Sequence, residues 1–307
     1  MIRLCAALIT VLLASGNIAL AQDVGPLPAI GDISNTPIDK VPAKKLFASK
    51  REPADLKARS IGFYSRGCLA GAQALPISGP AWQVMRLSRN RNWGHPKLIA
   101  LLEQLADEAQ LFDGWNGLLV GDISQPRGGP MLTGHASHQI GLDADIWLTP
   151  MPNRILSASE RENMSAVSMV LDHKTLNRAV WTEAQAKLIK RAASFPQVER
   201  IFVHPPIKAE LCRWATGDRS WLAKVRPYFG HDYHFHIRIG CPDNQAGCKD
   251  QPAPKPADGT GCGTELAYWL GSKPWRKAPP PKNPPKPAPA MTLKALPAEC
   301  RDVVMAP

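Results

Sequence analysis

The sequence has 307 residues, a formal net charge of +11 and a hydrophobic share of 44%. No stretch beyond the N-terminus is long and apolar enough to cross a bilayer, and no nucleic-acid-binding motif is present, so an integral membrane protein and a nucleic-acid binder are both disfavoured. The positive charge suits an anionic partner, unless it serves mainly to keep the protein soluble.

The first 21 residues form the pattern of a secretory signal peptide. Arg3 supplies a positive charge, residues 4–13 are mostly apolar, and residues 19–21 give an A-x-A cleavage site before Gln22. The apolar run is too short to span a membrane. We therefore expect export and a soluble mature protein.

Three segments are expected after the signal peptide. Residues 22–60 are rich in proline and alanine and predict an extended lead-in, whereas residues 61–272 have the length of one large folded domain. Residues 273–307 form a tail, and its first part, residues 273–297, contains nine prolines and six Lys or Arg residues without an acid. That composition predicts a semi-rigid, polyproline-like basic stretch.

Local patterns within the folded domain predict helices and short strands. Residues 96–112 predict a helix, because proline suits its first turn and leucines recur at helical spacing along one face. Residues 117–123 and 198–203 predict strands. Between them, a capping box at residues 182–185 predicts a helix that ends near Ser194. Because the strands and helices do not alternate regularly, the sequence favours an α+β fold over a doubly wound sheet.

The cysteines predict a cross-linked C-terminal part. Cys5 lies in the signal peptide, and six cysteines remain: Cys68, Cys212, Cys241, Cys248, Cys262 and Cys300. An even number in an exported chain predicts three disulfides, and 15 pairings are open on the sequence alone. A cysteine metal site is disfavoured, because no C-x-x-C pair is present.

Five of the eight histidines lie in two segments, residues 135–145 and 231–236. In the strand-like run 142–148 of the first segment, alternation places Asp143 and Asp145 on one face. Aspartate is a poor strand former, so two on one face need a reason, and a bound cation is one. A turn at Gly141 could bring His138 back beside this strand.

The second segment has the same logic. Residues 234–239 alternate as a strand, so His234 and His236 point into the same groove and both can serve one centre. Imidazole and carboxylate are the ligands of a catalytic zinc, which keeps a fourth position open for water. If one histidine binds zinc, the other stands where it can handle a proton. A structural metal and chance surface or core histidines remain the alternatives.

These motifs resemble the penicillin-insensitive murein endopeptidases. The likeness is carried by residues 134–139 with Asp145 and by residues 230–236. It covers roughly residues 40–270. The wider group includes lysostaphin-type peptidases, D-Ala-D-Ala dipeptidases and the hedgehog N-terminal domain. Further segments resemble the same family: residues 67–72, 86–96 and 202–208.

The resemblance implies a role for each residue of the two segments. His138, Asp145 and His236 would be the zinc ligands. His234 would act as a base or stabilise the oxyanion at the scissile amide. His231 would be a second imidazole that handles protons or orients the substrate.

Other residues are assigned less directly. His135 would lie near the metal, where it could contact a second ion or the substrate. Asp172 with His173 could belong to a second metal position, and a surface loop is the alternative. His204, between a strand end and two prolines, and His95, ahead of Pro96, are expected to be structural.

The resemblance also implies the substrate, which is the D-alanyl–meso-diaminopimelyl cross-link of peptidoglycan in the periplasm. Penicillin acylates a nucleophilic serine, whereas zinc-dependent hydrolysis forms no acyl-enzyme, so insensitivity to penicillin is expected. Arg86, Arg89 and Arg91 could meet substrate carboxylates, or could be solvated at the surface. A zinc D,D-carboxypeptidase or dipeptidase and a non-catalytic peptidoglycan-binding protein are the alternatives, and a homodimer is compatible with the sequence.

The family pattern finally implies a cross-linked fold. It corresponds to a single α+β domain with a central antiparallel sheet flanked by helices and loops. Its disulfides would pair Cys68 with Cys300, Cys212 with Cys262, and Cys241 with Cys248. The proline- and lysine-rich stretch is a departure from a minimal member of the family.

Overall fold

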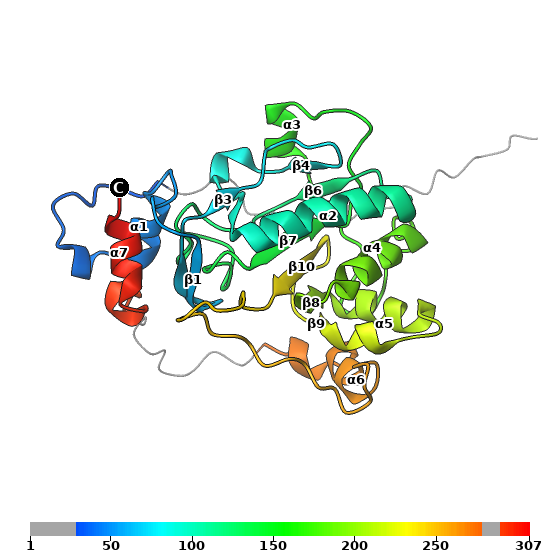
Figure 1. Cartoon of the computed structure of the whole chain (residues 1–307). Coiled ribbons are helices and arrows are strands. Elements are labelled where there is room, and N and C mark those ends of the chain that lie inside the picture. Colours follow the sequence, from blue (N-terminus) through cyan, green and yellow to red (C-terminus); the bar gives the residue numbers. More distant parts are fainter. Residues whose placement is uncertain (1–28, 278–288) are drawn as a thin grey trace, which may run out of the picture.

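The computed structural model describes residues 29–277 and 289–307, so the predicted signal peptide and part of the proline-rich stretch lie outside the described residues. A six-stranded sheet forms the centre of the molecule (Figure 1). Its strands, in spatial order, are β4 (Trp82–Val84), β6 (Leu118–Val120), β7 (Asp143–Trp147), β10 (His234–Ile239), β8 (Val198–Val203) and β9 (Val225–Pro227).

The sheet is mixed. Strands β6, β7, β10 and β8 pair antiparallel, whereas the outer pairs β4–β6 and β8–β9 are parallel. The predicted α+β class is confirmed, and the antiparallel pairing implied by the family holds for the four central strands. The two outer parallel pairs were not expected, because they join segments that are distant in the sequence.

Three helices cover one face of the sheet: α2 (Pro96–Phe112), α4 (Glu183–Ser194) and α5 (Pro205–Trp214). Figure 1 shows α2 running across β7 and β10, with α4 beside it. Ala144 and Ile146 of β7 and Phe235 and Ile237 of β10 enter the same hydrophobic core as these helices. Alternation along β7 and β10 therefore leaves the polar residues of both strands on the opposite face.

The predicted elements of the folded domain are present, although the strand expected over residues 117–123 is shorter and comprises only β6. Helix α2 and strand β8 have the predicted bounds, and a capping box between Thr182 and Gln185 starts α4. His95 caps α2, since its side chain accepts a hydrogen bond from the backbone N–H of Lys97.

The remaining helices and strands are short. They are α1 (Ala43–Ala48), β1 (Arg59–Phe63), β2 (Arg66–Ala70), β3 (Gln73–Ala74), β5 (Trp93–Gly94), α3 (Ala158–Asn163), α6 (Thr264–Leu270) and α7 (Glu299–Met305), with 3-10 turns η1 (Ile38–Lys40), η2 (Leu87–Arg89), η3 (Ser220–Lys224), η4 (Lys273–Trp275) and η5 (Leu293–Ala295). In the described part of the chain, no helix is both long and apolar enough to cross a membrane.

A second hydrophobic cluster joins segments from both ends of the described chain. Helices α1 and α7 lie side by side and pack on the β1–β2 hairpin (Figure 1). The Cys68–Cys300 disulfide is buried within this cluster. Arg127 stabilises the end of α7, because its guanidinium donates to the carbonyl oxygens of Val303, Val304 and Ala306.

Two further disulfides join Cys212 to Cys262 and Cys241 to Cys248, which completes the pairing that the family resemblance implied. The first ties α5 to the loop before α6, and the second closes the loop after β10. A disulfide stabilises a fold mainly by restricting the unfolded chain. Both links therefore restrict the irregular segment after β10, one by joining it to α5 and the other by closing a loop within it.

Candidate metal centre

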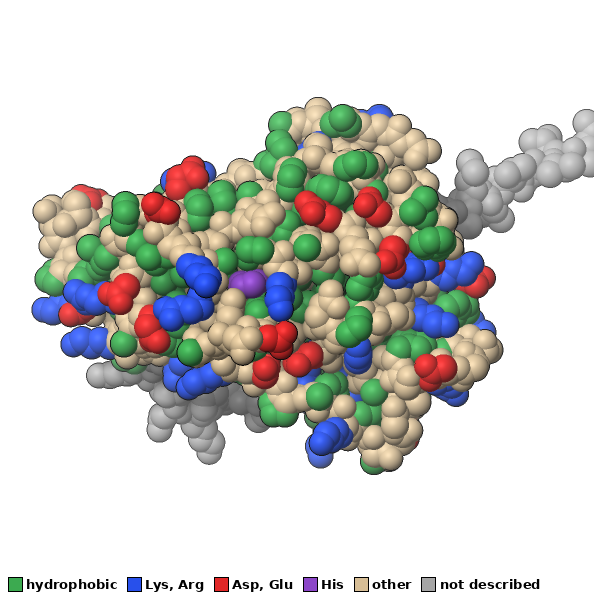
Figure 2. Space-filling view, in the orientation of Figure 1, with side chains coloured by type: hydrophobic (Ala, Val, Ile, Leu, Met, Phe, Trp, Pro, Cys, Tyr) green, Lys and Arg blue, Asp and Glu red, His purple; other side chains and the backbone are tan. Residues whose placement is uncertain are grey.

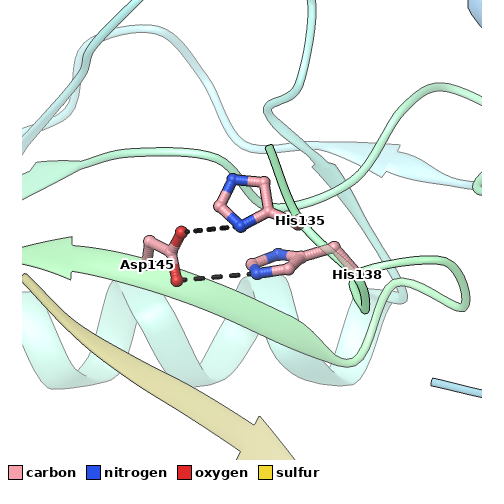
Figure 3. A group of neighbouring side chains, drawn as sticks. All are labelled: His135, His138 and Asp145. Carbon is pink, nitrogen blue, oxygen red and sulfur yellow. Dashed lines mark ion pairs between the residues drawn. The ribbon is translucent and has the colours of Figure 1, made fainter. Parts of the chain in front are cut away.

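The candidate site is built where β7 and β10 lie side by side. In their register His236 stands directly opposite Asp145, and residues directly opposite on neighbouring strands share a face. The loop before β7 adds His135 and His138. Gly141, with φ of +69°, turns this loop, and a Cβ atom there would clash with the Leu69 side chain. The turn expected at Gly141 is therefore present, and it brings His138 beside Asp145 (Figure 3).

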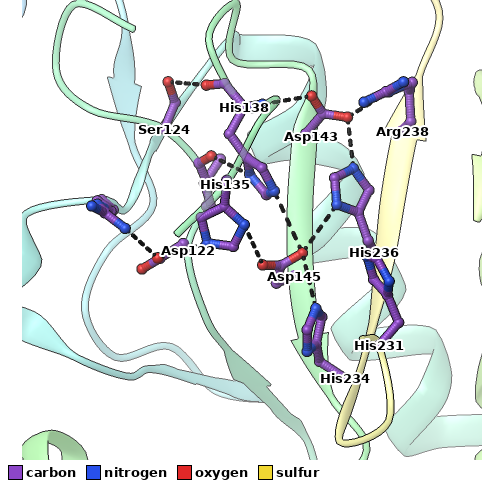
Figure 4. A network of polar contacts seen from close by, with 12 residues as sticks. Asp122, Ser124, His135, His138, Asp143, Asp145, His231, His234, His236 and Arg238 are labelled. Carbon is purple, nitrogen blue, oxygen red and sulfur yellow. Dashed lines mark hydrogen bonds and ion pairs between the residues drawn. The ribbon is translucent and has the colours of Figure 1, made fainter. Parts of the chain in front are cut away.

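Four imidazoles converge on the carboxylate of Asp145 (Figure 4). Its Oδ1 lies 3.2 Å from His236 Nδ1, 3.5 Å from His138 Nε2 and 3.6 Å from His234 Nε2. Its Oδ2 lies 3.5 Å from His135 Nδ1. Yet Asp145 Oδ1 and His138 Nε2 are buried without a hydrogen-bond partner. Ligand atoms of His135, His138 and Asp145 lie within 4.8 Å of one another and could hold a metal ion.

Hydrogen bonds on the far side of two rings fix their tautomers. His138 Nδ1 lies 2.6 Å from the carbonyl oxygen of Ile123, and His236 Nε2 lies 2.8 Å from Asp143 Oδ1. A carbonyl or a carboxylate oxygen can only accept, so each of these nitrogens carries the proton. In the neutral form of each ring, the nitrogen that faces Asp145 is then unprotonated and has a lone pair for a metal ion.

Asp143 supports this arrangement rather than facing the centre. Its carboxylate accepts from His236 Nε2, from Arg238 Nε at 2.7 Å and from the backbone N–H of His138 at 3.0 Å. Burial disfavours its charge, but Arg238 outweighs this effect, and the pKa of the Asp143 carboxyl lies far below its ordinary value. The sequence indicated that Asp143 and Asp145 share a face, and it did not separate their roles.

Asp122 is a functional candidate that the sequence interpretation missed. It follows β6, and its Oδ2 lies 2.7 Å from Arg91, 2.9 Å from His135 Nε2 and 3.3 Å from Arg89. Burial disfavours the charge of Asp122, but His135 and the two arginines hold the pKa of its carboxyl well below the ordinary range. A lone aspartate after a predicted strand gave little signal. The side chains of Arg89 and Arg91 are buried, so the alternative that they are solvated at the surface is wrong.

His231 and His234 lie on the other side of Asp145. His231 has φ of +57°, its Nδ1 lies 2.7 Å from the carbonyl oxygen of Phe229, and its ring is 5.0 Å from that of His234. His234 Nδ1 is buried without a hydrogen-bond partner. Burial lowers the pKa of both imidazoles.

The structure places other candidates away from Asp145. Asp172 is exposed and accepts hydrogen bonds from the backbone N–H groups of Lys174 and Thr175, so it stabilises its own turn. The rings of His173 and His204 both pack on Trp275, at 4.9 and 5.4 Å. None of these residues belongs to the group around Asp145 in the described chain, and a second metal position at Asp172 stays a prediction.

An α+β fold with a buried cluster of imidazoles around one carboxylate defines a candidate metal-binding protein. Comparison with known proteins gives its family. The family model described as penicillin-insensitive murein endopeptidase matches residues 60–305. Proteins with this name are similar to the chain: one from Haemophilus influenzae is 46% identical over 281 residues, covering 89% of this chain and 90% of that protein. Another, from Klebsiella pneumoniae subsp. pneumoniae, is 40% identical over 264 residues, covering 86% and 92%. The chain therefore belongs to the penicillin-insensitive murein endopeptidase family, as its motifs indicated.

Proposed function

We propose that this chain is an exported, zinc-dependent endopeptidase that hydrolyses the D-alanyl–meso-diaminopimelyl cross-links of peptidoglycan in the periplasm. Membership of the murein endopeptidase family supports the substrate class. The observation that carries the metal is the pair of unpartnered buried atoms, Asp145 Oδ1 and His138 Nε2. Buried polar atoms are nearly always paired, so such a pair next to further imidazoles points to a ligand between them.

His138, Asp145 and His236 would hold the zinc ion, since two imidazoles and one carboxylate are a zinc donor set. When bound, zinc supplies Lewis-acid activation of the scissile carbonyl and of water. The hydrogen bonds that His138 Nδ1 donates to Ile123 O and His236 Nε2 donates to Asp143 Oδ1 support this assignment, because they leave the inward nitrogen of each neutral ring free to coordinate.

His234 is suited to move the proton. Its Nε2 lies 3.6 Å from Asp145 Oδ1, and its Nδ1 has no hydrogen-bond partner, so the ring stands beside the ligands without a hydrogen bond that competes for Nδ1. It would accept a proton from the attacking water and pass it to the leaving amine. His231 would orient the substrate next to it. His135, held by Asp122, would contact the substrate or a second ion.

Digestion of purified cross-linked muropeptide dimers tests the proposal. Zinc-loaded protein should convert dimers to monomers, with or without penicillin, and a chelator should stop the reaction until zinc is restored. Product masses decide the specificity, because a D,D-carboxypeptidase would release only D-alanine. Full activity in protein shown to be free of transition metals would refute the role of zinc. An absence of any product from zinc-loaded protein would favour a peptidoglycan-binding protein.

A further inference from the structure

A small cavity opens beside the candidate metal centre. Its volume is about 180 Å³, and Asp145 and His234 are among the residues that line it. The other lining residues include Arg86, Arg89, Arg91, Asp122, Trp147 and Tyr233. Figure 2 shows a histidine with Lys and Arg side chains on either side of it on the face seen there. By its lining residues, the cavity combines candidate catalytic groups with three arginine side chains.

The protein holds two of these arginines firmly. Arg86 has φ of +57°, donates to the carbonyl oxygens of Arg161, Glu162 and Met164 at 2.7–3.0 Å, and lies over the Trp147 ring. In the same cavity, the Arg91 guanidinium donates to Asp122 and to the carbonyl oxygen of Thr133. Groups fixed in this way lose little side-chain entropy when a ligand binds.

The charge of the lining favours an anion. Arg86, Arg89 and Arg91 bring three positive charges to the lining, since guanidinium groups stay protonated at all relevant pH values, and Asp122 and Asp145 bring two negative ones among the described lining residues. Asp145 is a candidate metal ligand, and a bound divalent cation would make the cavity still more positive. Arg91 Nε is also buried without a hydrogen-bond partner.

We propose that this cavity binds a carboxylate on the carbon that bears the scissile amide nitrogen. The inference rests on the proposed function, and it specifies which substrates that function accepts. In the D-alanyl–meso-diaminopimelyl cross-link, this carbon of diaminopimelate carries a free carboxylate. Because Asp145 and His234 line the same cavity, a carboxylate bound there keeps the scissile amide beside both.

The arginines would therefore distinguish a free carboxylate from its amide. An amidated diaminopimelate keeps the size of the group but loses its charge, and it presents N–H donors to guanidinium donors. Terminal D-Ala-D-Ala peptides offer the same chemistry, because the leaving alanine carries a carboxylate in the same position. The test must separate these two sources.

Three substrates test the inference with the zinc-loaded, full mature chain. They are a cross-linked dimer with the free carboxylate, the same dimer with that carboxylate amidated, and a pentapeptide ending in D-Ala-D-Ala. We expect kcat/KM for the free dimer to exceed that for the amidated dimer by about 10- to 100-fold, the range of a hydrogen bond to a charged group. Cleavage of the pentapeptide at a comparable rate would identify the carboxypeptidase substrate as the source.

Arg89→Gln is the variant of choice, because Asp122 would keep its closer contact with Arg91 at 2.7 Å. It should move the ratio of free to amidated dimer towards one, and Arg89→Lys should retain part of the preference. Arg154→Gln is the matched control, since it removes the same charge from an exposed arginine that pairs with Glu160 outside the cavity lining. The control should keep the wild-type ratio, and thermal unfolding with zinc content shows whether each variant is folded and loaded.

A wild-type ratio near one overturns the inference and needs no variant, so a misfolded variant cannot mask it. Equal ratios in Arg89→Gln and Arg154→Gln also overturn it. If no substrate is cleaved, the proposed function fails. The carboxylate site is then tested separately by calorimetry, which compares binding of the monomer product with its carboxylate free and with its carboxylate amidated. Tighter binding of the free form upholds the carboxylate site, and equal binding overturns it.

Discussion

Asp143→Asn is the most informative single change at the candidate centre. The Asp143 carboxylate takes hydrogen bonds from His236 and Arg238 on Oδ1 and from the backbone N–H of His138 on Oδ2. An amide of the same size has one acceptor and one donor. Whichever way it turns, at least one buried donor faces another donor, and the Arg238 charge loses its counterion.

Two effects should follow. The first is a loss of stability of about 3 kcal/mol, since breaking a buried ion pair by removing one partner costs about 3–5 kcal/mol and the amide oxygen restores part of the hydrogen bonding. The second is a weaker hold on zinc, by about 10- to 100-fold, because an outer hydrogen bond that orients a ligand contributes that much. The ring of His236 can then turn or change its tautomer.

The assay is zinc affinity by competition with a chelating dye, together with urea unfolding. Leu105→Ala is the control: Leu105 is fully buried in α2 within the main core, and its truncation should cost about 2–5 kcal/mol without touching the centre. That control should bind zinc normally despite its lower stability. If Asp143→Asn binds zinc as tightly as the wild type, Asp143 does not position the ligands and the tautomer argument fails.

Three further predictions concern the ligands, the disulfides and pH. His236→Ala should lose zinc and activity together, whereas His234→Ala should keep zinc and lose about 10²–10⁴-fold in rate. Zinc content is measured on dialysed protein, and an equal loss of zinc in both variants would make His234 a ligand. Replacing Cys68 and Cys300 by serine should lower the free energy of unfolding by about 2–5 kcal/mol, while thiol titration of denatured wild-type protein should find no free cysteine after export. Burial lowers the pKa of His95 to about 4, below its ordinary 6.5, so the unfolded chain binds the proton more tightly and stability falls as the pH drops through this window. His95 alone should account for about 2 kcal/mol of the loss between pH 7 and pH 5. Urea unfolding of His95→Asn, which keeps a capping acceptor, should show a correspondingly smaller loss.

Local patterns predicted the elements that depend on local chemistry. Helix α2 has the predicted bounds because a proline start, a capping His95 and an apolar stripe act within a few turns. The same holds for the capping box of α4 and for strand β8. The pairing of β4 with β6 and the packing of α1 on α7 depend on contacts between distant segments, and no local pattern encodes them.

The candidate centre divides in the same way. Strand alternation brought Asp145, His234 and His236 to one face, since the period of a strand decides which way side chains point. The same alternation gave Asp143 an equal claim to face a metal ion. Asp143 supports the ligands because Arg238 and the backbone N–H of His138 lie next to its carboxylate in the folded chain. The spacing of residues along a strand does not predict which groups pair with a buried carboxylate. Asp122 shows the stronger case, because the arginines and the histidine that it pairs with come from two separate loops. Sequence patterns of this kind can therefore identify residues that face a centre. The groups that set the protonation and orientation of those residues become visible only in the folded chain. Variants of these supporting groups, such as Asp143 and Asp122, should therefore separate effects on metal binding from effects on catalysis.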